Sequence, residues 1–575
     1  MKMKFFFSVA VFLAVLAFAA CDQEPFERRS PLPIPSYDGK TGYDPFDPNG
    51  DELTPKLWIK SAEVVAGTPS VIKVTFSEAV TIADISRFTV KVNDAPAVRV
   101  GQFSGNTDPL LDKSMTSRTV TAAEPASSGR SDTWNLTINA PAKHGEILRL
   151  ALSLGAVVGR ELGVVNAVIP EVIVQNLVPR GGFVPTAAGF YEGSTNKTSS
   201  LASGTGETLY QRAITWLATP ANQTNGAVYT IALGANQTYT GAATFTSAQL
   251  AAVSGTVAAN AVIYASRSFT IVLTSADNTE KIITVSESGS ALVLRGGVTL
   301  IIDKNVAIEH ANQGAATNPY NGQPLIRMDG GGKLILDGGE IRKNYRSGLF
   351  TDWTGGAAGV AIYGDDGGIN TGGQAYFIMN SGKVTQNVME PTEAIAAAGG
   401  VSILGKGYFV MHGGEVSNNE TIHSTASQSR DVYGIAGGIA ATHSVMKASQ
   451  SASTSRVNLQ AIYITGGEIK GNKITGGNTT NPGVSAGGIM IFGTFQKTGG
   501  TIKDNINDVV PGIRRLQVGV QYGTKDGDTS QHWYRDAAAG EDVILFTAGV
   551  KASSPNASAA GTVIRPTWIP NNWKN

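Results

Sequence analysis

The chain has 575 residues, 42% of them hydrophobic and 16% charged, so it can bury a large core and is long enough for two to four domains. Lys and Arg together number 45, as do Asp and Glu, and a chain without a net positive field is a poor partner for nucleic acid or an anionic lipid surface. The 68 glycines follow no Gly-X-Y period, which excludes a collagen and indicates glycine at the turns of a repeat.

Residues 1–20 have the pattern of a secretory signal peptide. Lys2 and Lys4 precede an apolar run at 5–18, which is short for a membrane span. Cys21 is the only cysteine, so no intramolecular disulfide can form. The motif FAAC resembles the bacterial lipobox, with Phe18 where Leu is usual. This resemblance implies acylation at Cys21 and a lipid anchor in the membrane; an ordinary signal peptide with an incidental cysteine is the alternative.

Residues 21–55 are predicted to be an extended tether. The segment is rich in Pro, Asp and Gly and has no apolar periodicity, so it should hold the folded part away from the membrane. Asp44, Asp47, Asn49 and Asp51 are spaced loosely as in a calcium loop. Because no bidentate Glu follows at the required distance, a solvated acidic linker is the better interpretation.

Residues 56–177 are predicted to form a β-sandwich. Short runs of alternating apolar and polar residues are separated there by Gly, Pro, Asn and Asp, which is typical of sandwich strands. The segment VIKVTFSEAV followed by RFTVKVN resembles the opening strands of the Ig-like domains of bacterial cell-surface proteins. The resemblance implies a structural stalk or an adhesion unit, and we favour the stalk. Trp134 is expected to pack in the core rather than form a binding platform.

Residues 178–206, rich in Gly, Ser and Thr, are expected to be a linker to the one clear helical pattern. The motif ETLYQRAITWLA places Leu209, Ala213, Trp216 and Leu217 on one face of a helix. A short amphipathic helix ahead of many strands suits a cap over the first turn of a solenoid, whose open strand edge would otherwise invite aggregation.

Residues 207–507 are predicted to be a solenoid built from an internal repeat. The pattern apolar-x-apolar-x-Gly-Gly-x-Ile-x-x-Asn recurs, approximately, five times. A second pattern, Gly-Gly followed by a short apolar run, precedes it in most repeats, so each turn offers three short strands. This is the geometry of a right-handed parallel β-helix, in which each strand pairs with its equivalent about 4.8 Å away. The five repeats end at Asn344, Asn387, Asn419, Asn472 and Asn505.

Equivalent residues of such a repeat should stack in columns. The terminal asparagines are expected to form a corner ladder, bonding along the stack and tolerating left-handed backbone, rather than a row of ligands. The inward columns are predicted to be Val360, Val401, Ile439 and Ile489; Leu336, Met379, Met411 and Ile464; and Ile341, Val384, Val416, Ile469 and Ile502.

The repeat, at 210–507, resembles the right-handed β-helix of pectate-lyase-like proteins. It is more similar to Gly-Gly-rich surface lipoproteins of host-associated bacteria in which M-x-G-G-x-I-x-x-N recurs. The resemblance implies an extracellular position and an adhesin-like or glycan-contacting role, mostly without an assigned reaction. The expected fold is all-β: an Ig-like β-sandwich followed by a right-handed parallel β-helix with a short N-terminal capping helix.

An enzyme on this fold would need two poised acid or base groups on adjacent outward positions. The outward positions of the third strand carry Glu and Lys of mixed sign, which predicts a solvated ladder. Asp365 and Asp366 are the strongest catalytic candidates and resemble the aspartate pair of polygalacturonase-type enzymes. The accompanying Asn-Thr-Asp, Gly-His-Gly and Arg-Ile-Lys motifs are missing, so we favour an acidic turn.

No cofactor is expected. The six histidines are scattered and Cys21 is assigned to the anchor, so no transition-metal cluster is predicted. His412 occupies the position that Asp337, Asn380 and Thr465 hold in other repeats, and it is interpreted as an interchangeable turn residue.

Insertions follow the terminal Asn in successive repeats, at 345–355, 388–398, 420–436 and 473–486. Loops that leave one corner of stacked turns should cluster on one side, and such loops often carry function. Aromatic and polar side chains in them suit sugars or protein surfaces, although insertions without function are the alternative. The predicted binding residues are Tyr345, Trp353, His423, Arg430 and Tyr433, together with Tyr363, which lies near the insertions.

These features predict a monomeric, lipid-anchored protein of the bacterial outer membrane, exposed on the cell surface. We expect a non-enzymatic, adhesin-like role in binding a glycan or a partner protein; a polysaccharide lyase or glycoside hydrolase is the alternative. Residues 508–575 are expected to form an atypical last turn and a C-terminal cap. Lys497 falls in a column that is apolar elsewhere, which suggests an open final turn or a change of register.

Overall fold

A computed structural model shows an all-β protein with several parallel sheets, as predicted. The described residues belong to one compact unit, Thr54–Trp573. The predicted signal peptide, Cys21 and the tether lie outside them. The structure describes residues 57, 59–93, 115–127, 130–159, 169–204, 206–239, 262–264, 268–286, 289–316, 322–349, 356–364, 374–393, 396–423, 434–442, 460–476, 485–491, 494–507, 520–522, 532–534 and 543–545.

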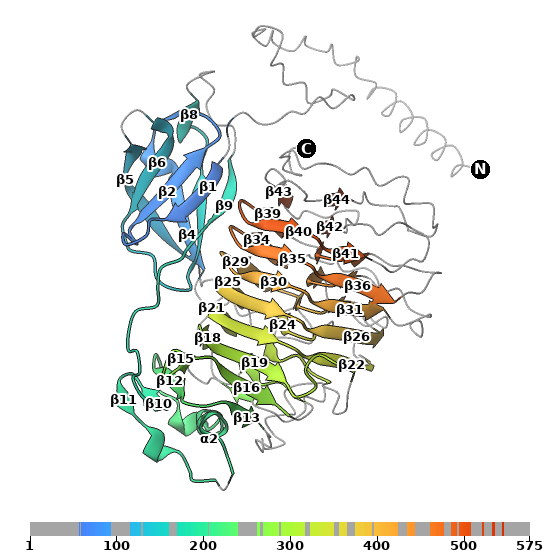
Figure 1. Ribbon diagram of the computed structural model, residues 1–575. Helices are drawn as coiled ribbons and strands as arrows, with labels where there is room; N and C mark the ends of the chain where they lie inside the picture. The colour runs from blue at the N-terminus through green and yellow to red at the C-terminus, as the bar shows by residue number, and fades with distance from the viewer. Residues whose placement is uncertain are drawn as a thin grey trace, which may run out of the picture. The chain divides into compact units, whose positions relative to one another are not determined.

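The N-terminal domain, the described residues from 57 to 178, is one continuous antiparallel sheet of seven strands in the order β1-β2-β6-β5-β4-β7-β9 (Figure 1). A separate pair, β3 and β8, lies beside it. The strands are β1 (Ile59–Val64), β2 (Val71–Phe76), β3 (Val80–Ile82), β4 (Phe88–Asn93), β5 (Met115–Ser127), β6 (Arg130–Ile138), β7 (Ile147–Leu152), β8 (Val157–Gly159) and β9 (Ile169–Val174), with a 3-10 turn η1 at Ile85–Arg87.

This sheet curls until its two edges meet. The Val64 amide donates to the Gln175 carbonyl at 2.9 Å and the Gln175 amide donates to Ala62 at 2.8 Å. Alternate residues point inward, as at Ile72 and Val74, and form a single buried core. The all-β character predicted for this domain is confirmed, and its seven strands are hydrogen-bonded into one curled sheet. Trp134 packs against its core as expected.

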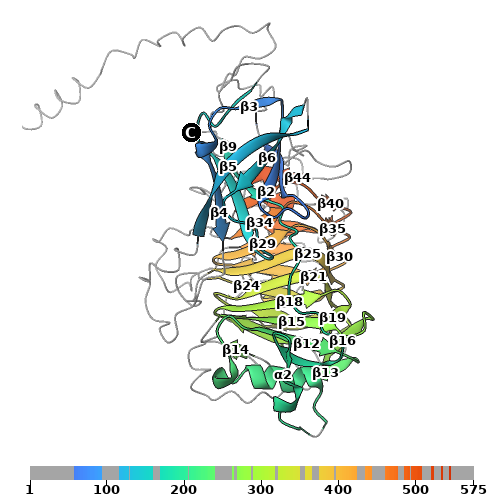
Figure 2. The same cartoon turned by 90° about the vertical axis from the view of Figure 1, so that its left-hand side faces the viewer.

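The first strands of the C-terminal part are covered by a helix and a hairpin. The structure describes one α-helix, α2 (Leu209–Leu217), and the Thr208 hydroxyl caps it by accepting from the Gln211 amide. Strand β10 pairs antiparallel with β12 and protects its edge. Figure 2 shows α2 beside β12 and β13. The elements are β10 (Gly189–Glu192), β11 (Thr195–Asn196), η3 (Thr198–Ser200), α2 and η4 (Pro220–Asn222).

The buried face of α2 differs from the predicted one. Ala213 and Leu217 are buried as expected, but Tyr210 and Ile214 complete the buried face, whereas Leu209 and Trp216 are only partly buried. The reason is that the Tyr210 hydroxyl reaches through the core and donates to the Ala291 carbonyl at 2.9 Å.

From β12 onward, strands pair in parallel with their equivalents one repeat later. We call this part the strand stack; it is compatible with a parallel β-helix. Its long sheet, named D, continues in Figure 1 through β12 (Val228–Leu233), β13 (Gln237–Tyr239), β15 (Phe269–Ser275), β16 (Lys281–Val285), β18 (Val298–Asp303), β19 (Val306–His310), β21 (Lys333–Arg342), β25 (Ala375–Thr385), β29 (Gly407–Met411), β30 (Glu415–Ser417), β34 (Ala461–Ile464), β35 (Glu468–Lys470), β39 (Thr494–Lys497), β40 (Thr501–Lys503) and β43 (His532–Tyr534).

Three further parallel sheets complete the stack. Sheet E contains β14 (Val262–Tyr264), β17 (Leu292–Arg295), β20 (Ile326–Met328), β24 (Val360–Tyr363), β28 (Val401–Leu404), β33 (Ile439–Thr442), β38 (Ile489–Ile491), β42 (Val520–Tyr522) and β44 (Val543–Leu545). Sheet F contains β22 (Tyr345–Leu349), β26 (Val388–Glu393), β31 (Glu420–His423), β36 (Lys473–Gly476) and β41 (Ile506–Asn507). Sheet G contains β23 (Gly356–Ala357), β27 (Ala396–Ala398), β32 (Gly434–Ala436) and β37 (Ser485–Ala486).

The three predicted inward columns are confirmed. Val360 pairs with Val401 and then Ile439, and the columns through Met379 and Val384 have the predicted register as well. All their members belong to one buried core. Like residues stack on like because equivalent positions of consecutive repeats are direct neighbours in the sheets.

The asparagine ladder is also present, with one correction. Asn387 donates from its amide and from Nδ2 to Oδ1 of Asn419, at 3.1 and 3.0 Å, and Asn419 does the same to Asn472. The left-handed residue, however, is the one before each asparagine, as at Gln386 (φ 58°) and Asn418 (φ 54°). The turn therefore places the asparagine side chain inward, where it is buried.

The stack continues past the last recognisable repeat. Strands β42, β43 and β44 extend sheets E and D in parallel. Lys497 aligns with Ile464 on one side and Tyr534 on the other, and it is buried. The expectations of an open final turn and of a register change at Lys497 are therefore both wrong.

Candidate functional site

The described parts of the predicted insertions form strands. Each begins as a strand of sheet F and returns as a strand of sheet G, so a full repeat such as β28 to β32 contains five strands instead of the three predicted. Tyr345 pairs with Val388, Val388 with Glu420, and Glu420 with Lys473. The insertions thus lie on one side of the stack, where Figure 1 labels β22, β26, β31 and β36. We call sheets F and G together the insertion platform.

Small residues hold the platform together. Ala357, Ala398, Ala436 and Ala486 form a buried column, and the Thr421 hydroxyl of sheet F donates to the Ala436 carbonyl of sheet G at 2.6 Å. The glycine pairs that follow the return strands allow close backbone approach. A Cβ at Gly400, for example, would lie only 2.6 Å from the Gly438 carbonyl oxygen. The second repeated pattern, Gly-Gly followed by a short apolar run, is thus explained by packing.

The side chains of sheet F bond to one another across repeats. The Tyr345 hydroxyl bonds to Glu390. In the following repeats Lys473 pairs with Glu420 at 2.8 Å, and the Thr475 hydroxyl bonds to the same carboxylate. This network orients the first residues of each insertion. The later residues of the insertions, which we call the tips, do not repeat in sequence.

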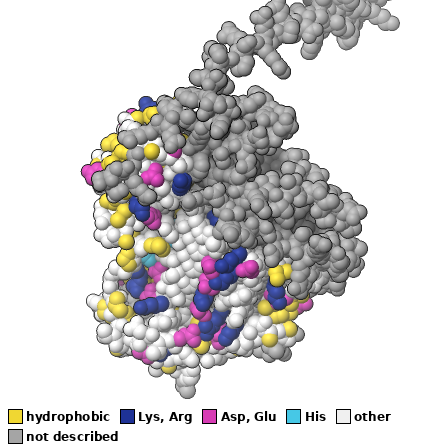
Figure 3. All heavy atoms as spheres, turned by 45° about the horizontal axis from the view of Figure 1, so that its top comes forward, with side chains coloured by type: hydrophobic (Ala, Val, Ile, Leu, Met, Phe, Trp, Pro, Cys, Tyr) yellow, Lys and Arg dark blue, Asp and Glu magenta, His cyan; other side chains and the backbone are white. Residues whose placement is uncertain are grey.

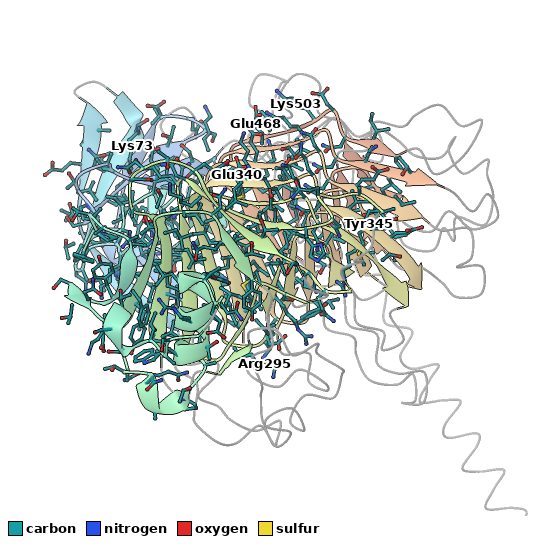
Figure 4. All side chains as sticks on the ribbon, turned by 60° about the horizontal axis from the view of Figure 1, so that its bottom comes forward. Lys73, Arg295, Glu340, Tyr345, Glu468 and Lys503 are labelled. Atoms are coloured by element: carbon teal, nitrogen blue, oxygen red, sulfur yellow. The ribbon has the colours of Figure 1, made fainter. Side chains whose placement is uncertain are left out.

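A second group of residues lies on the outer side of sheet E. We call it the arginine cluster; it consists of Arg295, Arg327, Asp329 and Tyr363, with Arg346 of sheet F nearby. Arg295 and Arg327 both bind the Asp329 carboxylate, the latter at 2.9 Å, and the Arg327 guanidinium lies 4.9 Å from the centre of the Tyr363 ring. Arg346 of β22 donates to the Ala357 carbonyl at 2.9 Å. Figure 4 shows Arg295 and Tyr345 on different parts of the stack.

Electrostatics in this cluster favour structural ion pairing. Burial alone would raise the pKa of Asp329, but the charges of Arg327 and Arg295 outweigh it and lower the pKa below its ordinary value. Burial lowers the pKa of Arg346 to about 10. Asp329 therefore stays ionised near neutral pH and cannot serve as a general acid, which must carry a proton.

The predicted charged ladder is the third feature of the outer surface. In register, Glu340 pairs with Lys383, and Glu415 with Glu468. Neighbouring charges bind one another: Lys470 contacts Glu468 and also Glu415, the latter at 3.5 Å. Figure 3 shows the resulting stripe of mixed sign, and Figure 4 labels Glu340, Glu468 and Lys503 along it. The ladder is partly exposed to solvent, as predicted, and its charges also pair with one another.

The predicted site residues are only partly described. Tyr345 and Tyr363 are both buried and lie on different sheets, F and E. His423 is the last residue of β31, and only its backbone is described. Trp353, Arg430, Tyr433 and the catalytic candidates Asp365 and Asp366 lie outside the described residues.

Sequence reasoning missed the arginine cluster. Its signal is visible in the segments LVLRGG and LIRMDGG, which place Arg295 at the end of β17, Arg327 within the equivalent strand β20 and Asp329 directly after β20. Those charges interrupt an otherwise apolar strand, and buried charges are expected to be paired.

Comparison with protein-family models, with curated proteins and with solved structures finds no match for this chain. None of the helices in the described part of the chain is long and apolar enough to cross a membrane. Within the same residues, no group of three or more His, Cys, Asp or Glu side chains is placed to hold a metal ion.

Proposed function

We propose that this protein is a surface-exposed bacterial lipoprotein that binds a glycan or a partner protein through the tips of its insertion platform, without catalysis. In this proposal Cys21 carries the lipid anchor, the curled N-terminal domain is Ig-like, and the strand stack is a right-handed parallel β-helix. The roles of Trp353, His423, Arg430 and Tyr433 as contact residues belong to the same proposal.

The in-register pairing of sheet F supports this function most directly. It brings the beginnings of successive insertions to one side on rigid strands, and a rigid scaffold with variable loops is a common design of binding sites. The repeated surfaces are weaker candidates for a binding site, because the charges of the ladder already form ion pairs with one another. Residues that do not repeat can provide a specific surface.

A glycan-array screen beside a uronic-acid release assay separates binding from catalysis. We expect retention of at least one glycan class and no release of product over the incubation. Product release that is lost in Asp365→Ala or Asp366→Ala would instead identify a lyase or hydrolase. For the anchor, a labelled fatty acid is expected on the wild type and not on Cys21→Ser; equal labelling of both contradicts acylation there.

A further inference from the structure

Each repeat contributes a first strand to sheet D, and the outer face of these strands is apolar along several repeats. Strands β21, β25, β29 and β34 carry apolar residues at consecutive positions, so both of their faces are hydrophobic, a pattern of strands buried on both sides. The inward residues fill the core of the stack. The outward residues in one register column are Val272, Ile301, Ile335, Ile378, Val410 and Tyr463.

The N-terminal domain packs on this outer face. Ile147 of β7 and Ile173 of β9 belong to the same buried cluster as the outward column. The Arg149 guanidinium lies 5.8 and 5.3 Å from the ring centres of Tyr408 and Tyr463, a favourable cation–π arrangement. We call this interface the seam.

Directional hydrogen bonds fix the register of the seam. The Ile173 amide donates to Oε1 of Gln496 at 2.7 Å, and Nε2 of Gln496 donates back to the Glu171 carbonyl at 2.8 Å. Gln175 donates to the His412 carbonyl at 2.9 Å, and Lys333 donates to Gly145 at 3.1 Å. Polar backbone and side-chain groups of the N-terminal domain and of the strand stack thus form hydrogen bonds with one another.

A column of corner residues carries the charged contacts of the seam. Arg180 pairs with Asp303 at 2.7 Å, and in the next repeat Nε2 of His144 lies 2.9 Å from Oδ2 of Asp337. The other oxygen of Asp337 accepts from Asn380 at 2.8 Å. His144 and Asp337 are 13% and 17% exposed, so water screens the pair only weakly.

The surroundings of His144 call for two donors on its ring. Nδ1 lies 2.9 Å from the Val178 carbonyl, which can only accept, and Nε2 faces a carboxylate. Neutral imidazole has one N–H, whereas imidazolium has two and can donate to both neighbours. On losing its proton the ring would turn a lone pair toward one of these oxygens.

We propose that His144 and Asp337 form a proton-dependent latch that holds the N-terminal domain against the strand stack, closed when the imidazole is protonated. Of the charged groups near the pair, Arg180 opposes the imidazolium and Asp303 repels the Asp337 carboxylate. Lys333 donates to the carbonyl of Gly145, which follows His144 in the sequence, and Glu146 is paired with Arg118 within the N-terminal domain.

The pKa of His144 has the direction that a latch requires. Burial alone would lower this pKa, but the hydrogen bond and charge of Asp337 and the Val178 carbonyl together raise it. A raised pKa in the closed state means that the latch contributes fully below the ordinary pKa of histidine and that its contribution is lost as pH rises through the raised value. His412 in the same column differs, because burial lowers its pKa to about 3 and keeps it neutral.

Hydrogen exchange at the Ile173 amide reports whether the seam is closed, because that amide donates across it. In the full chain, after correction for intrinsic exchange, we expect Ile173 to exchange about threefold to tenfold faster at pH 8.5 than at pH 6, the range expected for losing the net contribution of one typical intramolecular hydrogen bond. His144→Gln and Asp337→Asn should exchange at the fast rate at both pH values. His412→Asn, a change in the same column, should keep the wild-type dependence.

A pH-independent rate in the wild type, or an unchanged pH dependence in His144→Gln, overturns the latch. If His144→Gln loses its near-ultraviolet dichroism and does not fold, the wild-type titration decides alone: the midpoint must lie above the ordinary histidine pKa, and a midpoint at or below it also overturns the latch.

Discussion

At the scale of single residues, the corner asparagines are part of the buried hydrogen-bond framework. Asn419 accepts two bonds from Asn387 and donates from Nδ2 to the Val384 carbonyl at 2.9 Å and to Asn472. Loss of this side chain leaves several buried polar groups without partners, and each such group costs about 1–3 kcal/mol.

Asn419→Ala is therefore expected to lower the free energy of unfolding by about 2–5 kcal/mol, measured by chemical denaturation. The neighbouring Asn418 is exposed and has φ 54°. Asn418→Gly should consequently change stability by no more than about 1 kcal/mol, because glycine adopts positive φ without strain. Equal effects of the two substitutions would show that the ladder is not a structural device.

At the scale of elements, the repeated Gly-Gly pair sets how closely sheet G approaches its neighbours. At Gly400 a methyl group would meet the backbone oxygen of Gly438 at 2.6 Å and Nδ2 of Asn419 at 3.1 Å. Backbone oxygen atoms cannot move aside cheaply, so the strand itself would have to shift.

We expect Gly400→Ala to destabilise the protein by about 1–3 kcal/mol, with a lower thermal melting temperature as the readout. Gly181→Ala is the matched control, because no atom lies within 4 Å of a Cβ there and its φ is ordinary. Its melting temperature should equal that of the wild type or rise slightly. A tolerated Gly400→Ala would mean that the platform is more loosely packed than described.

The elements differ in how far their sequence reveals them. The inward columns could be predicted because a strict repeat places equivalent residues on one another, and the observed register at Met379 and Met411 agrees. The strands of the insertion platform could not be predicted. Segments such as YRSGL in β22 do not alternate between apolar and polar residues, and they become strands by pairing with neighbouring repeats. For the candidate site, the sequence predicted that the insertions leave a shared corner, and the pairing of sheet F agrees with this.

At the scale of the whole molecule, the seam joins the N-terminal domain to strands of the stack that are distant from it in sequence. Its signal was present in runs such as KLIL and YFIM, which are apolar at consecutive positions. What covers them could not be predicted, because Ile147 and Ile173 come from alternating strands that look like any others. His412 lies at a bend directly after β29, as its interpretation as a turn residue predicts, but the contact of its carbonyl with Gln175 across the seam could not be predicted.

The buried outer face leads to a prediction on one strand, β25. Ile378 points outward from the stack but is buried in the seam, whereas Lys383 on the same strand is exposed. Ile378→Ala should cost about 2–4 kcal/mol of unfolding free energy, like a core truncation, and Lys383→Ala less than about 0.5 kcal/mol. A small effect at Ile378 in chemical denaturation would contradict a seam that stays closed.

The most direct test of the proposed function is an exchange of the insertion tips. Residues 424–433 and 477–484 would be replaced by Gly-Ser segments of equal length, which leaves strands β31, β32, β36 and β37 intact. Glu468→Gln with Lys470→Gln in the charged ladder serves as the control. For a ligand found on the array, we expect at least about a tenfold loss of affinity in the tip exchange and wild-type affinity in the control. Unchanged binding by the tip exchange would contradict a binding role of the insertion platform.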